Sequence, residues 1–441
     1  MAKYTTADIR NIALTGRAGA GKTTLVESML HNAGAIGRVG RVEDGNTVCD
    51  YDDLEKDMHH SLDSAVVHID HENHHINLID TPGSPDFLGR SISALPAVET
   101  VAVMLDPTAG IDTVSRRMMN IGERRSLPRM IIVNKMDNAS NLGELLEQIT
   151  EAFGGVCRPV NLPTNGGQAV IDCFANATGD SDLGSLEDFH TGIVEQVVEV
   201  DEELMEKYLE EGEVSADALQ EAFKRALREA HLVPICFVSA RENHGVKEMM
   251  DLIVNLCPNP SEGNPRHFTI GAGDDQKDVT PEADDSQPLL AHVFKVSSDP
   301  YVGKLSVFRV HQGHLGTDVH PHVDDHKKPV RISHIFKLQG KNHTEIDNLM
   351  PGDIGAVAKI EEIDFDSVLH SGDQGDNVRF NSIPLPKPMY GLAIEGTSKG
   401  AETKLSEALQ KMVAEDPTLE YERVVATGET VLRGLGEQHL R

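Results

Sequence analysis

The eight residues GRAGAGKT, Gly16–Thr23, follow an apolar stretch and precede a helix-like stretch in this 441-residue sequence. The pattern G-x-x-x-x-G-K-[ST] is typical of a loop that binds phosphate, because glycines turn backbone N–H groups inward and a helix N-terminus favours negative charge. We expect Lys22 to reach the β- and γ-phosphates of a nucleotide and the Thr23 hydroxyl to bind Mg²⁺. The candidate phosphate-binding residues are Gly16, Arg17, Ala18, Gly19, Ala20, Gly21, Lys22, Thr23 and Thr24.

A second candidate segment, LIDTPGSPDF, occupies residues 78–87. Its apolar part ends at Asp80, which could hold Mg²⁺ through a water molecule. Gly83 could offer its backbone N–H to a γ-phosphate, since a residue without a Cβ lets the turn come close. Asp-x-x-Gly alone is weak evidence, but its place after a phosphate loop strengthens it. The nucleotide-binding candidates here are Asp80, Thr81, Pro82, Gly83 and Ser84.

Two later segments could recognise a base. The Asp137 carboxylate of NKMD can accept from guanine N1–H and its exocyclic amine, whereas adenine would leave it unpaired. We expect the Lys135 stem to lie across the base and Asn134 to connect loops, while a backbone N–H of Ser239 or Ala240 could meet guanine O6. These motifs predict GTP or GDP and disfavour an ATPase or a small-molecule kinase. The base-side candidates are Asn134, Lys135, Met136, Asp137, Ser239, Ala240 and Arg241.

The elements that position these motifs alternate between strands and helices, which predicts a parallel sheet covered by helices on both faces. Every motif follows a predicted strand, and ligands of such sheets bind at the carboxyl ends of the strands. The expected strands are Asn11–Thr15, His75–Asp80, Thr100–Asp106, Met130–Val133 and Val233–Val238, and the expected helices are Lys22–Asn32, Val114–Arg125 and Gly245–Asn255.

The rest of the chain divides by composition. Residues 1–262 form the nucleotide-binding domain, with an acidic helical insertion at about 155–231. Residues 263–288 are rich in Pro, Gly and Asp and are interpreted as a linker, and residues 289–380 alternate as a small β-barrel does. Residues 384–441 predict a β-α-β-β unit that lacks a closing helix and strand, so we expect a truncated domain.

The formal net charge of −31 disfavours a DNA-binding protein, since phosphate contacts need clustered Lys and Arg. Lys327, Lys328 and Arg331 form the one small basic candidate for RNA, and a solvated loop is the alternative. No apolar run approaches about 18 residues, and the five cysteines form no CxxC pair. We therefore expect a cytoplasmic protein with free thiols and no membrane contact.

Six histidines, at positions 59, 60, 68, 71, 74 and 75, raise the possibility of a metal site. The favoured alternative is a hairpin over His68–His75, with its tip at Asp70–Asn73 and its histidines on exposed positions.

The motif order, the insertion between NKMD and Ser239, and the segments DPYVGKLSVFRVHQG and GETVLRGLGEQHLR resemble translational GTPases, specifically elongation factor G and its paralogues. The resemblance implies a multidomain fold: an α/β P-loop GTPase domain with a helical insertion, a β-barrel domain and a partial α+β ferredoxin-like domain. It implies GTP hydrolysis on the ribosome by a monomer, with ribosomal RNA and stalk proteins as partners. Loss of the γ-phosphate would release the Ser61 and Gly83 segments and reorient the barrel.

Departures from the family bear on catalysis. The family's water-positioning His after DTPG is Ser84 here, and its His-x-Asp in the phosphate loop is Arg17 and Gly19. Its Mg²⁺-binding Thr is Ser61, preceded by His59 in place of a glycine. We expect GTP binding to be kept and hydrolysis to be slow or differently activated. The catalytic candidates are Lys22, Gly83 and Ser84, and the metal candidates are Thr23, Ser61 and Asp80.

Two alternatives stay open at this point. The chain could be a GTP/GDP-switched ribosome-binding protein with little hydrolysis. It could also be a ribosome-protection factor, which shares these domains and differs in the family's last two.

Overall fold

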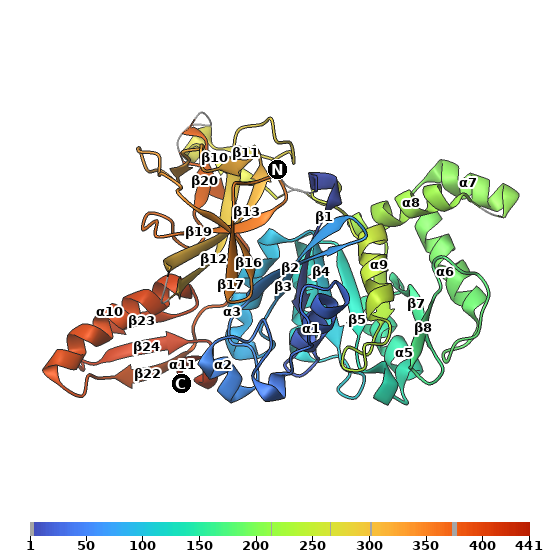
Figure 1. The fold of residues 1–441 in the computed structure, drawn as a ribbon, viewed down its shortest axis with the longest axis horizontal. Coiled ribbons are helices and arrows are strands. Elements are labelled where there is room, and N and C mark those ends of the chain that lie inside the picture. The colour runs from blue at the N-terminus through green and yellow to red at the C-terminus, as the bar shows by residue number, and fades with distance from the viewer. Residues whose placement is uncertain (1–3, 213, 265, 300–301, 373–376) are drawn as a thin grey trace.

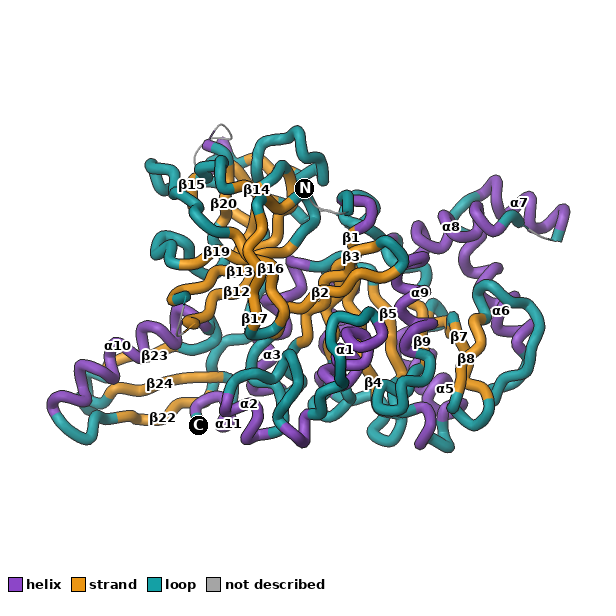
Figure 2. The backbone as a smooth tube through the Cα atoms, viewed as in Figure 1, coloured by secondary structure: helices purple, strands orange, loops and turns teal. Residues whose placement is uncertain are grey.

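The computed structural model describes residues 4–212, 214–264, 266–299, 302–372 and 377–441. Along the chain these form an α/β domain, a β-rich domain and a small α+β domain (Figure 1). The β-rich domain contacts the other two, and the sheets of the three regions form separate groups of strands (Figure 2).

The first domain is built on a seven-stranded sheet in the order β2-β3-β1-β4-β5-β9-β6. Only β2 is antiparallel to its neighbour, so the carboxyl ends of the other strands share one edge. The central strands are buried along their whole length, as expected for parallel strands covered on both faces. The strands are β1 Ile9–Thr15, β2 Ala65–His71, β3 His74–Asp80, β4 Thr100–Leu105, β5 Arg129–Val133, β6 Cys157–Pro159 and β9 Val233–Phe237.

Helices connect the strands of this sheet. Helix α1 begins directly at Lys22 after Gly21, and α4 begins after Asp112, whose carboxylate accepts from the N–H groups of Val114 and Ser115. Helices α1 and α9 contact each other beside the sheet. The helices of the domain outside the insertion are α1 Lys22–Asn32, α2 Asp53–Met58, α3 Leu88–Ala94, α4 Thr113–Arg124, α5 Leu142–Phe153 and α9 Val246–Leu256.

The acidic insertion has its own helices and a small hairpin. Helices α6 and α8 pack around buried Ile193, Val197 and Phe223, and their acidic residues are mostly exposed. The elements are the hairpin β7 Asn161–Thr164 with β8 Ala169–Asp172, and helices α6 Leu186–Val198, α7 Glu202–Glu211 and α8 Ala216–Arg228.

The β-rich domain contains a second seven-stranded sheet, in the order β15-β20-β12-β13-β19-β16-β17, with a core of its own. Strand β19 ends before Lys359, whose φ of 61° leaves the strand conformation, so residues 359–363 are not the strand that alternation predicts. The strands of the domain are β12 Leu290–Asp299, β13 Gly303–Gln312, β14 Leu315–Gly316, β15 His322–Val323, β16 Ile335–Gln339, β17 Asn342–Ile346, β18 Asn348–Leu349, β19 Ile354–Ala358 and β20 Val368–His370.

The interpretation of residues 263–288 as a linker is partly wrong. Strands β10 Phe268–Ile270 and β11 Lys277–Val279 pair with each other, and β10 also pairs with β21 Arg379–Phe380. Phe268 is fully buried and packs edge-on to Phe380, so this part of the chain belongs to the β-rich domain.

The last domain has a three-stranded sheet in the order β22-β24-β23 beside a long helix. Leu409 is buried on that helix, whereas Met412 and Tyr421 remain partly exposed. Its elements are β22 Tyr390–Ile394, α10 Lys399–Glu415, β23 Glu420–Arg423, β24 Thr430–Gly434 and α11 Glu437–Leu440.

Within the described ranges, no helix is both long and apolar enough to cross a bilayer.

Candidate functional site

A cavity of about 440 Å³ lies where the motif-bearing loops meet at the carboxyl edge of the first sheet. All four predicted motif segments contribute to its wall. The predicted residues that line it are Ala18, Gly19, Gly21, Lys22, Thr23, Thr24, Ser61, Gly83, Asn134, Lys135, Asp137, Ser239 and Arg241. Six further lining residues are Val42, Glu43, Asp50, His59, His60 and Asn138.

Nine predicted residues lie behind or beside this wall: Gly16, Arg17, Ala20, Asp80, Thr81, Pro82, Ser84, Met136 and Ala240. Several of them hold the wall in place. Thr81 donates its hydroxyl to the Leu14 carbonyl at 2.8 Å, and Met136 is fully buried in the hydrophobic core. Thr81 and Met136 therefore support the cavity wall without forming its surface.

The phosphate loop needs its glycines for close approach. A Cβ on Gly16, whose φ is 121°, would lie 2.5 Å from the Met104 carbonyl oxygen. A Cβ on Gly83 would lie 2.3 Å from the Ala18 nitrogen, and the Gly83 carbonyl accepts from that N–H at 3.0 Å. The turn after Asp80 is therefore packed directly on the loop.

The Lys22 side chain is buried inside the same loop. Its ammonium donates to the carbonyls of Gly16 and Arg17 at 3.0 and 2.9 Å. Burial lowers the pKa of Lys22, and the nearby Asp80 carboxylate acts in the opposite direction. The loop thus holds one ammonium group at the cavity wall, directed at its own carbonyls.

Four oxygen-bearing side chains meet beside Lys22 and form a candidate cation site. Thr23 Oγ1 donates to Asp80 at 2.6 Å, Ser61 Oγ donates to Asp50 at 2.7 Å, and the two hydroxyl oxygens are 3.3 Å apart. Asp50 Oδ2 and Asp80 Oδ1 are buried and have no hydrogen-bond partner among the described residues. Hard oxygen ligands of this kind fit Mg²⁺.

The two carboxyls of this cluster also affect each other. Burial, reinforced by the charge of Asp50, raises the pKa of Asp80 to about 7. Burial likewise raises the pKa of Asp50. The sequence did not predict Asp50 as a site residue, because no motif spacing connects it to Thr23. Its hydrogen bond from Ser61 forms only in the folded chain.

The base side of the cavity is organised by Asn134. Its amide donates to the Ala20 carbonyl and its Oδ1 accepts from the Ala240 N–H, both at 2.9 Å. Lys135 lies across the loop, donating to the Gly19 carbonyl at 2.8 Å and to Asp106 at 2.6 Å. Asp137 Oδ1 is buried without a hydrogen-bond partner in the described part of the chain. An acceptor is thereby left for a donor that enters the cavity.

The loop after β9 carries the predicted contact to guanine O6, from a backbone N–H of Ser239 or Ala240. In this structure Ser239 donates to the His244 carbonyl at 2.9 Å, and Ala240 donates to Asn134. Both N–H groups are used to fix this loop against the rest of the domain. The contact to guanine stays a prediction.

The histidines do not form one cluster. His59 and His60 line the cavity, whereas the other four lie on the β2–β3 hairpin, which turns at Glu72 and Asn73. The prediction of exposed hairpin histidines is wrong for His75, which is buried against Tyr4 at a ring-centroid distance of 4.0 Å. The other three, His68, His71 and His74, are only partly exposed. The β-rich domain covers this side of the hairpin, which its own sequence does not reveal.

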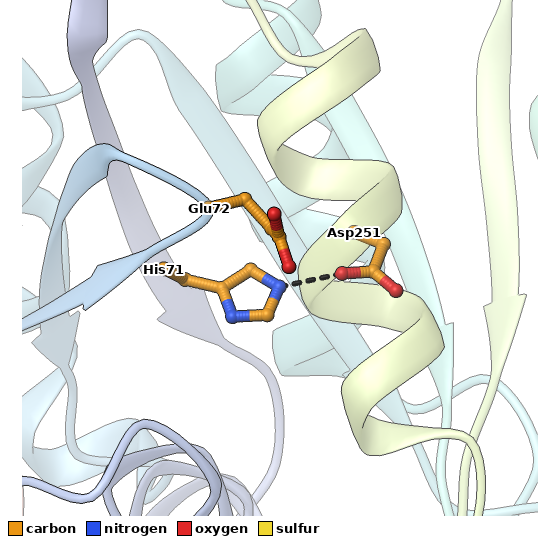
Figure 3. Close-up of side chains that lie close together, drawn as sticks. All are labelled: His71, Glu72 and Asp251. Carbon is orange, nitrogen blue, oxygen red and sulfur yellow. Dashed lines mark hydrogen bonds and ion pairs between the residues drawn. The ribbon is translucent and has the colours of Figure 1, made fainter.

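One histidine has the neighbours of a metal ligand. His71 Nε2 lies 2.5 Å from Asp251 of α9, and Glu72 reaches the same spot (Figure 3). The Asp251 carboxylate is partly exposed and already binds the imidazole. This trio connects the hairpin to α9, and no independent observation indicates an ion there.

Residues 7–259 match the family model described as the elongation factor Tu GTP binding domain. Residues 288–373 match elongation factor G domain 2, and residues 385–441 match elongation factor G domain III. A crystal structure of a protein from Thermus thermophilus is similar to this one, with a TM-score of 0.86 and 33% sequence identity. That match covers 98% of this chain and 65% of the other, so this chain spans less than two thirds of that relative.

Proposed function

Because this chain belongs to the translational GTPases and resembles elongation factor G, we propose that it binds GTP on the ribosome and couples hydrolysis to a conformational change. The observation that carries the proposal is the convergence of all four motif segments on one cavity, where Asp137 keeps an unpaired buried oxygen.

The residues at the cavity divide into three roles. Lys22 and the backbone N–H groups of the loop bind the β- and γ-phosphates. Gly83 approaches the γ-phosphate through the turn that packs on Ala18. Asp137 accepts from guanine N1–H and the exocyclic amine, while Lys135 covers the base.

Thr23 and Ser61 are the proposed direct ligands of Mg²⁺, with Asp80 and Asp50 holding its water molecules. When bound, Mg²⁺ would neutralise charge on the β- and γ-phosphates. The two hydroxyls already lie 3.3 Å apart, which suits ligands of a single ion.

Contacts of the Ser61 and Gly83 segments suggest how the change spreads. Lys295 of the β-rich domain pairs with Asp63 at 2.8 Å, two residues after Ser61. Arg90 of α3 pairs with Asp416 of the last domain at 3.0 Å. Loss of the γ-phosphate would release both segments, and these buried pairs would pass the movement to the two other domains.

The exposed acidic helices of the insertion are proposed to meet a ribosomal stalk protein.

A second function is favoured by one specific observation. Ser84 does not line the cavity, and its hydroxyl donates to Gln438 of the last domain. A chain in which this position takes no part in hydrolysis would act as a GTP/GDP switch with very slow turnover.

The test is nucleotide binding followed by turnover of the full 441-residue chain. Fluorescent GTP and GDP should bind in the presence of Mg²⁺, and ATP should not compete. Phosphate release measured with and without ribosomes then separates the two functions, since ribosome-stimulated release supports the GTPase and binding without release supports the switch. Binding of ATP as tight as that of GTP would contradict both.

A further inference from the structure

His60 lines the nucleotide cavity and has one ring nitrogen without a hydrogen-bond partner among the described residues. The residue lines the cavity together with Lys22, Ser61 and Gly83. Its Nδ1 lies 2.9 Å from the Met58 carbonyl, and a carbonyl only accepts, so Nδ1 carries the proton of the neutral ring. The other nitrogen, Nε2, is then an acceptor, and it is buried with no hydrogen-bond partner among the residues described.

The backbone on both sides of His60 is fixed. His59 ends helix α2 in the left-handed conformation, with φ of 54°, and its ring contacts the Val42 carbonyl at 3.3 Å. Ser61 is held by Asp50. The imidazole is therefore placed between two anchored neighbours in the wall of the cavity that Thr23 and Gly83 also line.

The position after Gly83, in contrast, is directed elsewhere. Ser84 is buried, its hydroxyl donates to Gln438 Oε1 at 3.2 Å, and it takes no part in the cavity wall. The side chain that directly follows the γ-phosphate turn is thus engaged with another domain.

We propose that His60 is a catalytic residue that orients the hydrolytic water by accepting its hydrogen bond on Nε2. The inference rests on the proposed GTPase function. It assigns the orientation of the water to His60, because Ser84 is engaged with the last domain. Asp50 accepts a hydrogen bond from Ser61 and keeps that segment in place.

The reaction then balances without a further reactant. The water oxygen forms a bond with the γ-phosphorus while the bond from that phosphorus to the β–γ bridging oxygen breaks, and the bridging oxygen leaves with GDP. One proton of the water passes to an oxygen of the departing phosphate. His60 accepts a hydrogen bond throughout, and Lys22 faces the charge that develops on the phosphates.

Two substitutions separate orientation of water from packing. His60→Asn keeps a donor near the position of Nδ1 and has no atom near that of Nε2. His60→Gln places an amide oxygen near the position of Nε2. An amide oxygen can orient an attacking water in this class of reaction. His74→Asn is the matched control, because His74 lies at the turn of the hairpin, does not line the cavity, and its ring contacts the Glu72 carbonyl at 2.8 Å.

The measurement is single-turnover GTP hydrolysis by the full chain with ribosomes, expressed per bound nucleotide so that a binding defect cancels. H60N should lose about 100-fold in rate with unchanged GTP affinity, H60Q should retain much more, and His74→Asn should match the parent. Equal rates for H60N and the parent would overturn the assignment, as would equal losses in H60N and H60Q. A parent that binds no GTP would instead refute the proposed function itself.

Discussion

Ser84 Oγ donates to Gln438 Oε1 at 3.2 Å, which joins the turn after the γ-phosphate glycine to the last helix of the third domain. The contact is not isolated. The Gln438 N–H donates to Asp86 at 2.8 Å, and the rings of Phe87 and His439 meet edge-on at 5.5 Å. These contacts attach the turn to helix α11, so we expect movement of either one to be passed to the other.

Asp86→Ala should loosen this contact. The Asp86 carboxylate acts as the N-terminal cap of α11 from another domain, and loss of a cap costs about 1 kcal/mol. Hydrogen exchange at residues 437–440 should become faster while exchange in the first sheet stays unchanged. Asp86→Asn keeps an acceptor and should behave like the parent. Unaltered exchange in α11 of Asp86→Ala would contradict the capping role.

Asp137→Asn should change the base that the chain selects. The amide would present a donor to the guanine N1–H and amine, so GTP affinity should fall by at least about 100-fold. Xanthosine triphosphate, which carries an oxygen in place of the amine, should bind the variant better than GTP does. Competition titrations with both nucleotides measure this, and a variant that keeps parental GTP affinity would rule Asp137 out as the base reader.

Asp353→Ala should destabilise the boundary between the first two domains. Asp353 and Lys337 form a buried ion pair, and the Lys337 ammonium also contacts His75 Nε2 at 3.0 Å and Asn77 Oδ1 at 3.1 Å. Removing one partner leaves a buried charge unpaired, which costs about 3–5 kcal/mol in unfolding free energy. The double variant K337M/D353L should lose less than Asp353→Ala alone.

The control for this experiment is Glu211→Ala. Glu211 pairs with Lys207 at 3.8 Å, with both side chains more than half exposed, so the change should cost less than about 1 kcal/mol. Denaturant unfolding followed by circular dichroism compares the variants. Equal losses from Asp353→Ala and the control would show that the buried pair has no special weight.

His68 should make the same boundary sensitive to acid. Burial, followed by the charge of Lys337, lowers the pKa of His68 to about 4, and its Nδ1 lies 2.9 Å from the Leu338 carbonyl. Between about pH 6.5 and pH 4 the unfolded chain takes up a proton that the folded chain does not. The unfolding free energy should therefore fall as the pH falls through this window, by up to about 3 kcal/mol from this residue.

The comparison is between the parent and His68→Asn, each unfolded at pH 4.5 and pH 7. The variant keeps a donor near Nδ1 and cannot titrate, so its stability should fall less on acidification. Some pH dependence should remain, because burial also lowers the pKa of His75. Identical pH dependence in both proteins would assign the effect to other groups.

The parts of the site that a local spacing encodes were predicted from the sequence. The start of α1 at Lys22, the end of β3 at Asp80 and the place of Asn134 directly after β5 follow from short patterns of apolar, glycine and polar residues. The parts that depend on distant partners were not. Strand β10 exists because it pairs with β21, more than a hundred residues later, and His75 is buried because Lys337 and Tyr4 cover it.

The same distinction applies within the cavity. Asp50 and His60 lie in a segment without a recognisable motif, and only folding brings them beside Thr23 and Gly83. Ala240 was predicted from its place after a strand, but its N–H is used by Asn134, a partner from another motif. Position along the chain predicts which residues reach the edge of the sheet, and it does not predict which of their hydrogen bonds are already made.

The hydrogen bond from the Ala18 N–H to the Gly83 carbonyl has a consequence for the order of events at the loop. An anion that takes this N–H must first displace the carbonyl, so the turn competes with the ligand for the same donor. Ser84 and Asp86 attach that turn to α11, so we expect any displacement of the turn on ligand binding to reach the third domain. In this arrangement, anion binding to the phosphate loop and displacement of helix α11 are expected to occur together.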